Sequence, residues 1–457
     1  MPRRLRILAL AGFAAAVLTA RGEAPAGAGL PLPENYFPAL KTMLATAARR
    51  SPRMVTRDLN EALAEGNRII ARAGLLPSAG GNFRYLPWDR DYRVADPRSP
   101  YTSEKIAYAV NLTQPLYHWG ALESTARIAE LQSKITRGET TETYRQLANE
   151  IRRQFLQLIV KKADLARTRT GQKRAEEQLQ LAQENLDRHA ISDADMFTPQ
   201  MAADQARLAT DRAVDDYDSS RLLLGKFVGT GPVGDDQVPD AIPEIPATPE
   251  RLKPYLDDYA NTAEPGAYLL RTVKDQIEVE KLNYRVASAR LRPSVDLVLG
   301  STQDEQSYTA NIGAKYGVTS YFAGIGVSWS LFDGRATKGI KINTLARRRE
   351  LERRYQQISG DLLDDARAKY RQLEFAARSL DLEERQLVRR DQDLDRVKDR
   401  LARGLASEAD VRNAEFARGG DQVDVYRARS DYLTRAADFL GSVLQDPVSA
   451  NLPASPP

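Results

Sequence analysis

Two very long stretches of the chain place apolar side chains three and four positions apart. They cover residues 120–228 and 334–444, where Pro199 is the only proline and the intervening positions are rich in Arg, Lys, Glu, Asp and Gln. Apolar residues at this spacing share one face of a helix, and the charged residues form a solvated opposite face. Each stretch breaks once, so each predicts a coiled-coil helical hairpin. Its arms would have roughly 50–70 residues and a length of about 75–105 Å.

Each break has the sequence of a helix end followed by a helix start. The two predicted hairpin tips consist of Ala190, Ile191, Ser192 and Asp193 and of Gly404, Leu405, Ala406 and Ser407. Gly404 suits the position after a helix C-terminus, where the backbone often takes a positive φ. Ser192 and Ser407 suit the N-cap of the returning helix, because a serine hydroxyl can accept a hydrogen bond from a free backbone N–H.

A different pattern, with a period of two residues, precedes each hairpin. In residues 106–113 and 321–331, apolar side chains alternate with small or polar ones, which is typical of β-strands. Their partner strands would be about 80–86 and 295–300, with polar loops at 87–100 and 301–319. The strand pairs therefore lie within residues 79–117 and 294–332. The alternation fits either a half-buried hairpin of a soluble domain or transmembrane strands of about 10 residues.

The whole order of elements occurs twice. The motifs at 116–117, 189–196 and 216–217 match those at 331–332, 404–411 and 431–432, each pair being 215 residues apart. Such constant spacing indicates two tandem repeats, which we place at residues 56–228 and 266–445. Each begins with a helix, about 58–72 and 265–290, that a proline-serine pair ends. Outside the repeats we expect an N-terminal segment at 25–55, a Pro- and acid-rich linker with little regular structure at 229–265, and a tail at 446–457.

The N-terminus has the order of a secretory signal peptide. Arg3, Arg4 and Arg6 precede the apolar residues 7–18, and small residues follow. Twelve apolar residues are too few to span a bilayer, so we assign residues 1–24 as a signal peptide, with cleavage between about Ala20 and Ala28. Arg21 stands where the lipid-bearing cysteine of a lipoprotein would be, so no lipid anchor is expected. Removing the three arginines lowers the net charge from +4 to about +1, and the sequence pI of 9.0 gives no support for nucleic-acid binding.

The composition also argues against an enzyme. The chain has no cysteine and only two histidines, His118 and His189, so disulfides and thiolate chemistry are excluded and metal or triad chemistry has few candidates. Residues 229–234 match the pattern G-x-G-x-x-G, but the match follows a helix and contains Pro232, where a dinucleotide site requires a strand before it and a helix after it. We therefore predict no catalytic residues, no metal and no cofactor.

Four strands are too few to close a barrel by themselves. About eight are the minimum, and free strand edges in lipid leave backbone groups without hydrogen bonds. If these strands span a bilayer, several chains must therefore contribute to one barrel. Three chains would supply twelve strands and room for a pore.

This order of elements strongly resembles the TolC family of trimeric outer-membrane efflux and secretion channels. The resemblance covers roughly residues 55–445, and its sharpest part is the segment 403–411 at the second tip. It implies an α+β membrane protein whose homotrimer forms a 12-stranded β-barrel, continued by an α-helical tunnel across the periplasm of a Gram-negative bacterium. It also implies partners, namely a periplasmic adaptor that docks on the two tips and an inner-membrane transporter behind it.

The resemblance also suggests where the pore is narrowest. In the family, acidic residues just beyond the second tip form a ring at the constriction. Here Asp410 matches, Asn413 occupies the next acidic position, and Asp195 is the counterpart of Asp410 in the first repeat. Leu401 stands where the family has a tyrosine of its closing network, so that network is not expected here.

The sequence thus predicts the outer-membrane exit duct of a tripartite efflux pump or type I secretion system, which passively exports substrates. The alternative is a periplasmic coiled-coil adaptor or structural protein with a soluble β-domain. An adaptor usually carries one helical hairpin, whereas this chain has two.

Overall fold

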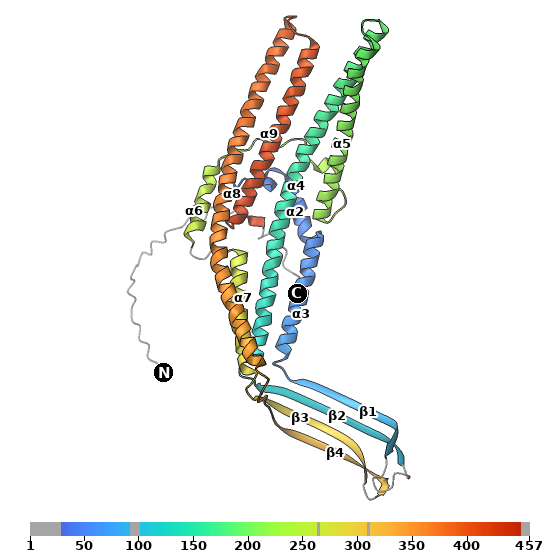
Figure 1. Cartoon of the computed structure of the whole chain (residues 1–457), viewed down its shortest axis with the longest axis vertical. Helices are drawn as coiled ribbons and strands as arrows, with labels where there is room; N and C mark the ends of the chain where they lie inside the picture. The colour runs from blue at the N-terminus through green and yellow to red at the C-terminus, as the bar shows by residue number, and fades with distance from the viewer. Residues whose placement is uncertain (1–28, 92–100, 263–265, 309–310, 449–457) are drawn as a thin grey trace, which may run out of the picture. The chain divides into compact units, whose positions relative to one another are not determined.

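The protein is described by a computed structural model that covers residues 29–91, 101–262, 266–308 and 311–448. The chain divides into two units, residues 1–30 and 31–457, and the described helices and strands all belong to the second. That unit is mostly helical and has one small antiparallel sheet (Figure 1). None of the helices in the described ranges is long and apolar enough to cross a membrane.

The same five elements follow one another twice. The first set is α3 (Pro52–Ala73), β1 (Ser78–Asp91), β2 (Tyr101–Tyr117), α4 (Ala121–Asp187) and α5 (Phe197–Val228). The second set is α7 (Tyr268–Ala289), β3 (Ser294–Tyr308), β4 (Asn311–Ser328), α8 (Ala336–Ala402) and α9 (Glu408–Ser442). Even the turn before each long helix is alike, because both its residues have positive φ, at Trp119 and Gly120 in one copy and Gly334 and Arg335 in the other.

The two long helices are the axis of each copy. α4 and α8 each have 67 residues, which corresponds to about 100 Å. The returning helices α5 and α9 have only 32 and 35 residues, so these arms are shorter than the roughly 50–70 residues that the sequence predicted. The reason is that the rest of each long helix packs against another partner, α3 along α4 and α7 along α8 (Figure 1). The copies join where α4 packs against α7 and α9.

The four strands form one antiparallel sheet in the order β1-β2-β3-β4. Both hairpins are longer than expected, since β1 reaches Asp91 and β3 reaches Tyr308, inside the segments predicted as polar loops. In contrast, β4 ends at Ser328, so residues 329–332 lie beyond the strand. The predicted loop residues 92–100 and 309–310 are outside the described ranges.

The register of the strands separates an apolar face of the sheet from a polar one. Pairs on the apolar face include Phe83 with Tyr108, Leu112 with Leu299, and Leu297 with Ile325. Pairs on the other face include Asn82 with Ala109, Asn111 with Gly300, and Ser294 with Ser328. The apolar side chains are not covered, and Phe83 and Ile325 are 71% and 68% exposed. The sheet therefore lacks the covering layer that a soluble β-domain would need.

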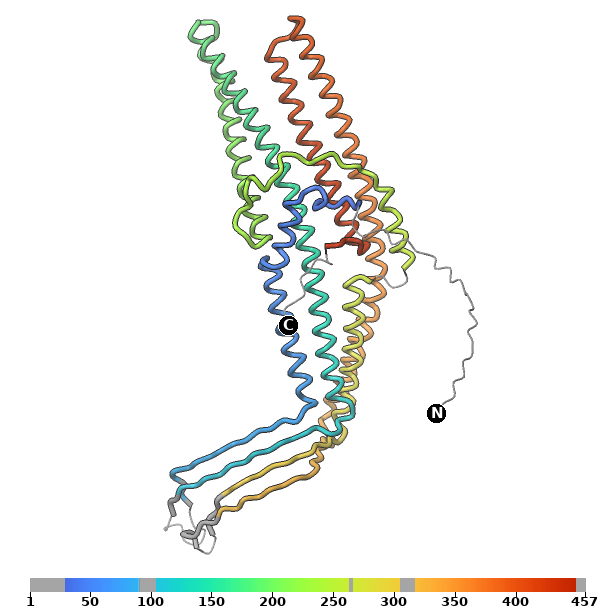
Figure 2. The backbone as a smooth tube through the Cα atoms, turned by 180° about the vertical axis from the view of Figure 1, so that it is seen from behind, coloured from blue at the N-terminus to red at the C-terminus, as the bar shows by residue number. Residues whose placement is uncertain are grey.

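The centre of the molecule contains the segments outside the two repeats. α1 (Pro33–Tyr36) and α2 (Pro38–Arg50) pack on α4, where the Phe37 and Phe155 rings meet edge to face at 5.5 Å. The segment after α5 contains the short 3-10 helices η2 (Asp235–Gln237) and η3 (Pro249–Leu252) and then α6 (Lys253–Asn261). As expected, residues 229–252 have little regular structure, but α6 is a regular helix that the prediction did not include. The segment also buries apolar residues against the helices: Val233, Val238, Ile242, Ile245 and Leu252. Figure 2 shows it crossing between the two copies.

A buried ion cluster ties both ends of the chain to α4. The Arg152 guanidinium, with 1% of its side chain exposed, lies 2.6 Å from Asp446 Oδ2 and donates from Nε to Glu34 Oε2 at 2.9 Å. Burial alone would lower the pKa of Arg152, but the hydrogen bonds and charges of Asp446 and Glu34 outweigh it and raise the pKa. Asp446 and Val448 are buried, so the start of the segment predicted as a tail is part of the core.

We expect Asp446→Ala to lower the free energy of unfolding by about 3–5 kcal/mol, because it leaves Arg152 buried with only one carboxylate. Urea unfolding of the purified protein in detergent, followed by circular dichroism, measures this loss. Arg385→Gln is the control, since it removes an exposed pair with Asp381 and should change stability by less than about 1 kcal/mol. Equal effects of the two substitutions would contradict a structural role for the cluster.

Candidate functional site

Both hairpin tips end their long helix with the same backbone motif. At the second tip, Leu405 N–H donates to Arg400 O at 2.8 Å and Gly404 N–H donates to Leu401 O at 2.9 Å, with Gly404 at φ 69°. These are the two hydrogen bonds of a Schellman motif, so the predicted role of Gly404 is confirmed. The Arg400 guanidinium also donates to Leu405 O at 3.1 Å.

The first tip makes the same motif without a glycine. Ala190 N–H donates to Asn185 O and His189 N–H donates to Leu186 O, both at 2.8 Å, and His189 has φ 57°. Histidine is one of the residues that enter this region more often than most, although less easily than glycine. His189 is therefore a helix-end residue. Within the described ranges, no group of three or more His, Asp or Glu side chains could hold a metal ion.

Each returning helix starts with a capping box. Ser407 N–H and Oγ both donate to Asp410 Oδ2 at 2.8 Å, and Asp410 N–H donates back to Ser407 Oγ at 3.2 Å. In the first tip, Ser192 N–H and Oγ donate to Asp195 Oδ2 at 2.9 and 2.7 Å. Both serines are N-caps, as the sequence predicted. The pairing of each serine with an acid three residues later is the signature of this motif.

The two tips differ in how the helix continues. α9 begins directly at Glu408, whereas a 3-10 turn, η1 (Asp193–Met196), precedes α5. Each tip exposes one large apolar side chain, Leu405 at 65% and Phe197 at 67%. Single exposed apolar side chains are common on protein surfaces, so these two residues do not define a contact surface by themselves.

The predicted constriction residues lie on these caps. Asp410 and Asn413 are exposed and one turn apart on α9, and Asp195 belongs to the other tip. The hydrogen bonds from Ser407 hold the pKa of Asp410 below its usual range, and those from Ser192 do the same for Asp195. Both carboxylates are therefore ionised at neutral pH. Among the described residues, no hydrogen bond or ion pair joins Asp195 to Asp410 or Asn413.

The structure also contains a contact between the two hairpins that sequence reasoning missed. The Phe416 ring of α9 packs on Gly171 of α4 at 3.1 Å from where a Cβ would be, and it lies between two arginines. The Arg167 and Arg174 guanidinium carbons are each 5.2 Å from the ring centroid. Such cation–π contacts are worth roughly 0.5–2 kcal/mol. One phenylalanine and two of many arginines form no recognisable sequence motif, so periodicity could not have found this contact.

The comparison with known families decides the identity of the chain. The profile of the family described as outer membrane efflux protein matches residues 43–230 and 268–440. The chain belongs to this family. The resemblance to the TolC family is thus confirmed. The family consists of efflux channels of the outer membrane rather than enzymes, so the protein is an outer membrane efflux protein and its tips belong to a channel.

Solved structures of other channels have the same fold. The CmeC outer membrane channel of Campylobacter jejuni superposes with a TM-score of 0.69 at 12% identity, covering 92% of each chain. VceC of Vibrio cholerae gives 0.63 at 15% identity, covering 90% of this chain and 97% of that one. The open state of MtrE from Neisseria gonorrhoeae gives 0.64 at 16% identity, covering 91% of both. No curated protein sequence matches the chain significantly.

We expect Ser407→Ala to destabilise the first turn of α9 by about 1 kcal/mol. The protection of its first amides from hydrogen exchange should then fall about fivefold. Hydrogen–deuterium exchange of residues 408–411 measures this, with Glu408→Ala as a control in the same turn. The pKa of Asp410 is lower in the folded state than in the unfolded chain. The stability that the Asp410 carboxylate gives to the tip is therefore complete above the ordinary carboxyl pKa and is lost as the pH falls below about 4. Equal exchange in both variants would show that the capping box does not stabilise the tip.

Proposed function

We propose that the protein is the exit duct of a tripartite efflux pump or type I secretion system. Three copies would place their four-stranded sheets side by side as one 12-stranded barrel in the outer membrane, and their long helices as a tunnel in the periplasm. The observation that carries this proposal is the sheet itself, with an exposed apolar face, a polar opposite face and direct continuity with helices of 67 residues. Four strands cannot satisfy their own edges in lipid, whereas twelve can close.

The outer helices of the layer support closure by further copies. α3 lies at one side of the series α3-α4-α7-α8, and α8 lies at the other. Leu59, Leu63 and Ile70 form a stripe on α3 and are 62%, 67% and 72% exposed. On α8, Ile342 is 57% exposed. We infer that α3 of one copy packs against α8 of the next.

In such a duct, the signal peptide and the hairpin tips have separate roles. The signal peptide at residues 1–24 directs export, and Arg21 leaves the mature chain without a lipid anchor. The tips dock a periplasmic adaptor, which connects the tunnel to an inner-membrane transporter. Leu405 and Ile191 are the large apolar residues among the eight that we assign to docking. The alternative of an adaptor with a soluble β-domain does not fit the family match or the uncovered apolar face of the sheet.

We expect Leu59→Asp combined with Leu63→Asp to prevent trimer formation, because six carboxylates would enter the three contacts between copies. Light scattering of the protein in detergent, corrected for bound detergent, should give about a third of the wild-type mass. Arg72→Asp, on the opposite face of α3, should keep the trimer. A wild-type protein that is monomeric and soluble without detergent would overturn the proposed function.

The proposed constriction predicts a second effect. Three Asp410 carboxylates near a threefold axis would attract cations, with Asn413 contributing no charge. In planar bilayers, Asp410→Ala should reduce cation selectivity and block by divalent cations, whereas Glu408→Ala should change both much less. Unchanged selectivity and unchanged divalent block in Asp410→Ala would remove Asp410 from the constriction.

A further inference from the structure

A cavity of 620 Å³ lies where the strands meet the helices in the second copy. Three arginines from separate places line it: Arg290 at the end of α7, Arg292 in the turn before β3, and Arg347 on α8. The lining also includes His118 and Trp119 just before α4 and apolar residues of α7 and α8. Its neutral hydrogen-bonding side chains are Asn283, Ser294, Ser328, Ser330 and Thr344. Guanidinium groups surrounded by hydroxyls and an amide are the donors that recognise oxyanions.

The three arginines have no carboxylate partner within the described part of the chain. Asp296 is bound instead by His118, whose Nε2 is 2.8 Å from Asp296 Oδ1. Asp333 accepts hydrogen bonds from Thr337 N–H at 2.8 Å and from its hydroxyl at 2.5 Å. These bonds lower the pKa of Asp333, and the nearby charge of Arg290 adds to the effect without forming an ion pair. The positive charge of the cavity is therefore not neutralised by its own walls.

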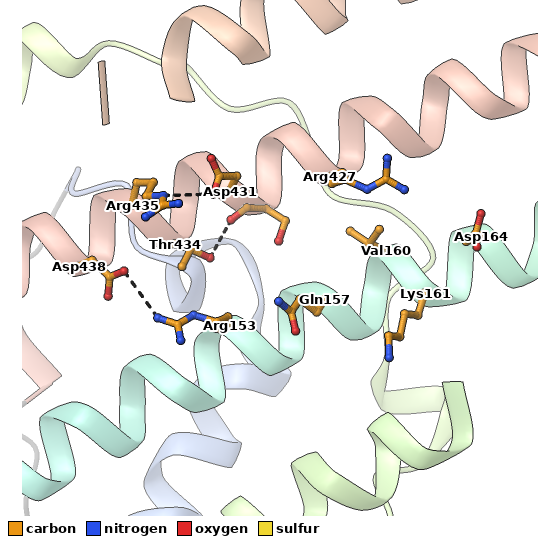
Figure 3. A pocket seen from close by; sticks show the side chains of 11 residues that line it. Arg153, Gln157, Val160, Lys161, Asp164, Arg427, Asp431, Thr434, Arg435 and Asp438 are labelled. Carbon is orange, nitrogen blue, oxygen red and sulfur yellow. Dashed lines mark hydrogen bonds and ion pairs between the residues drawn. The ribbon is translucent and has the colours of Figure 1, made fainter. Parts of the chain in front are cut away.

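Another cavity in the same protein shows the opposite arrangement. It has 640 Å³ and lies between α4 and α9 (Figure 3). There Arg153 pairs with Asp438 at 3.7 Å and Arg435 pairs with Asp431 at 3.2 Å, as the dashed lines in Figure 3 mark. Arginines that line a cavity in this fold can thus be given acidic partners. Arg290, Arg292 and Arg347, in contrast, have no such partner among the described residues.

One of the three guanidinium groups is held in place before any ligand arrives. Arg292 lies over the Trp119 ring, with its guanidinium carbon 4.7 Å from the centroid. The ring is fixed in turn, because Trp119 Nε1 donates to Pro293 O at 2.8 Å. A cation–π contact leaves the edge of the guanidinium free to donate hydrogen bonds. Preorganised donors bind an anion with a smaller loss of conformational entropy.

The internal duplication shows that the fold does not need these arginines. The positions that correspond to Arg290, Arg292 and Arg347 in the first copy hold Gly74, Leu76 and Gln132. The first copy makes the same helix, strand pair and long helix without any of the three charges. These charges are therefore not needed to form this set of elements, and the three arginines occur in the second copy alone.

The cavity is lined in part by strand residues of the polar face of the sheet. Ser294 and Ser328, which line it, are paired in the register on that face, as is Asp296, the partner of His118. In the proposed barrel this face is the lumen, which places the cavity on the path of the exported solute and away from the lipid. This argument rests on the proposed function.

We propose that Arg290, Arg292 and Arg347 form a binding site for multivalent oxyanions, with phosphate or carboxylate groups, that pass through the duct. Three copies would surround the lumen with nine such arginines at the junction of barrel and tunnel. The duct then binds anionic solutes at the junction of barrel and tunnel, although the proposed constriction at the tips carries negative charge. A bound phosphate-bearing lipid would use the same donors but would have to enter from the apolar face.

The test measures current through the trimer in planar bilayers with pyrophosphate added on the tunnel side. Wild type should show saturable block, and the triple variant R290Q/R292Q/R347Q should need at least about tenfold more pyrophosphate for half block, because charge-assisted hydrogen bonds are lost. The triple variant R290K/R292K/R347K keeps the charges but loses the guanidinium fork and the stacking on Trp119, so its half block should lie between those of wild type and R290Q/R292Q/R347Q. R353Q/R354Q removes two exposed arginines further along α8 and should leave the block unchanged.

The outcomes separate this site from the duct and from a lipid site. No conductance in wild type would overturn the proposed function itself. Conductance with the same block in wild type and R290Q/R292Q/R347Q would overturn the anion site alone, as would an equal loss of block in R353Q/R354Q. Native mass spectrometry tests for a lipid at the same site. The proposal would also be overturned, in favour of a headgroup site, if phospholipid binds to wild type, is absent from R290Q/R292Q/R347Q and is not displaced by pyrophosphate.

Discussion

The structure depends on the backbone hydrogen bonds at the edges of a four-stranded sheet. β1 and β4 each have one neighbour in the described sheet, so the N–H and C=O groups of their outer sides need partners from elsewhere. In water these groups would be hydrated, but the apolar face of this sheet is suited to lipid, where water is absent. The conflict between an apolar face and open edges is resolved only by more strands. This sheet therefore supports the proposed assembly of several copies.

The two copies form their helix ends with the same backbone motifs but with different residues. Both tips close with a Schellman motif and a serine–aspartate capping box, yet one uses Gly404 at positive φ and the other His189. The turns before the long helices likewise share their backbone conformation but not their residues. What is kept is the hydrogen bonding of the helix ends, since those groups have no partner within the helix. The side chains around them are free to differ, and the basic cavity of the second copy is one such difference.

Periodicity in the sequence located the long helices, the breaks and the capping serines, because each depends on local spacing. It underestimated the strands, since residues 87–91 and 301–308 carry polar side chains on both faces and so show no alternation. It also missed the order in the segment 229–262, where scattered residues such as Val238 and Ile242 are buried one at a time. Contacts between distant segments, such as Phe416 with Arg167 and Arg174, leave no trace in local patterns. In the cavity, Arg290 and Arg292 are near neighbours in the sequence, but only the fold places Arg347 in the same cavity.

Arg152 and its counterpart in the second copy, Arg367, show how far the two copies have specialised. Arg152 is buried between Glu34 and Asp446, whereas Arg367 is 51% exposed and pairs with Asp364 of its own helix at 3.6 Å. The first copy can therefore complete its interior only with residues that lie on either side of both repeats in the chain. A half-length gene fragment encoding the first copy would leave this arginine in an apolar interior with no counter-ion. The interior of the first copy therefore depends on two segments that lie outside its own repeat.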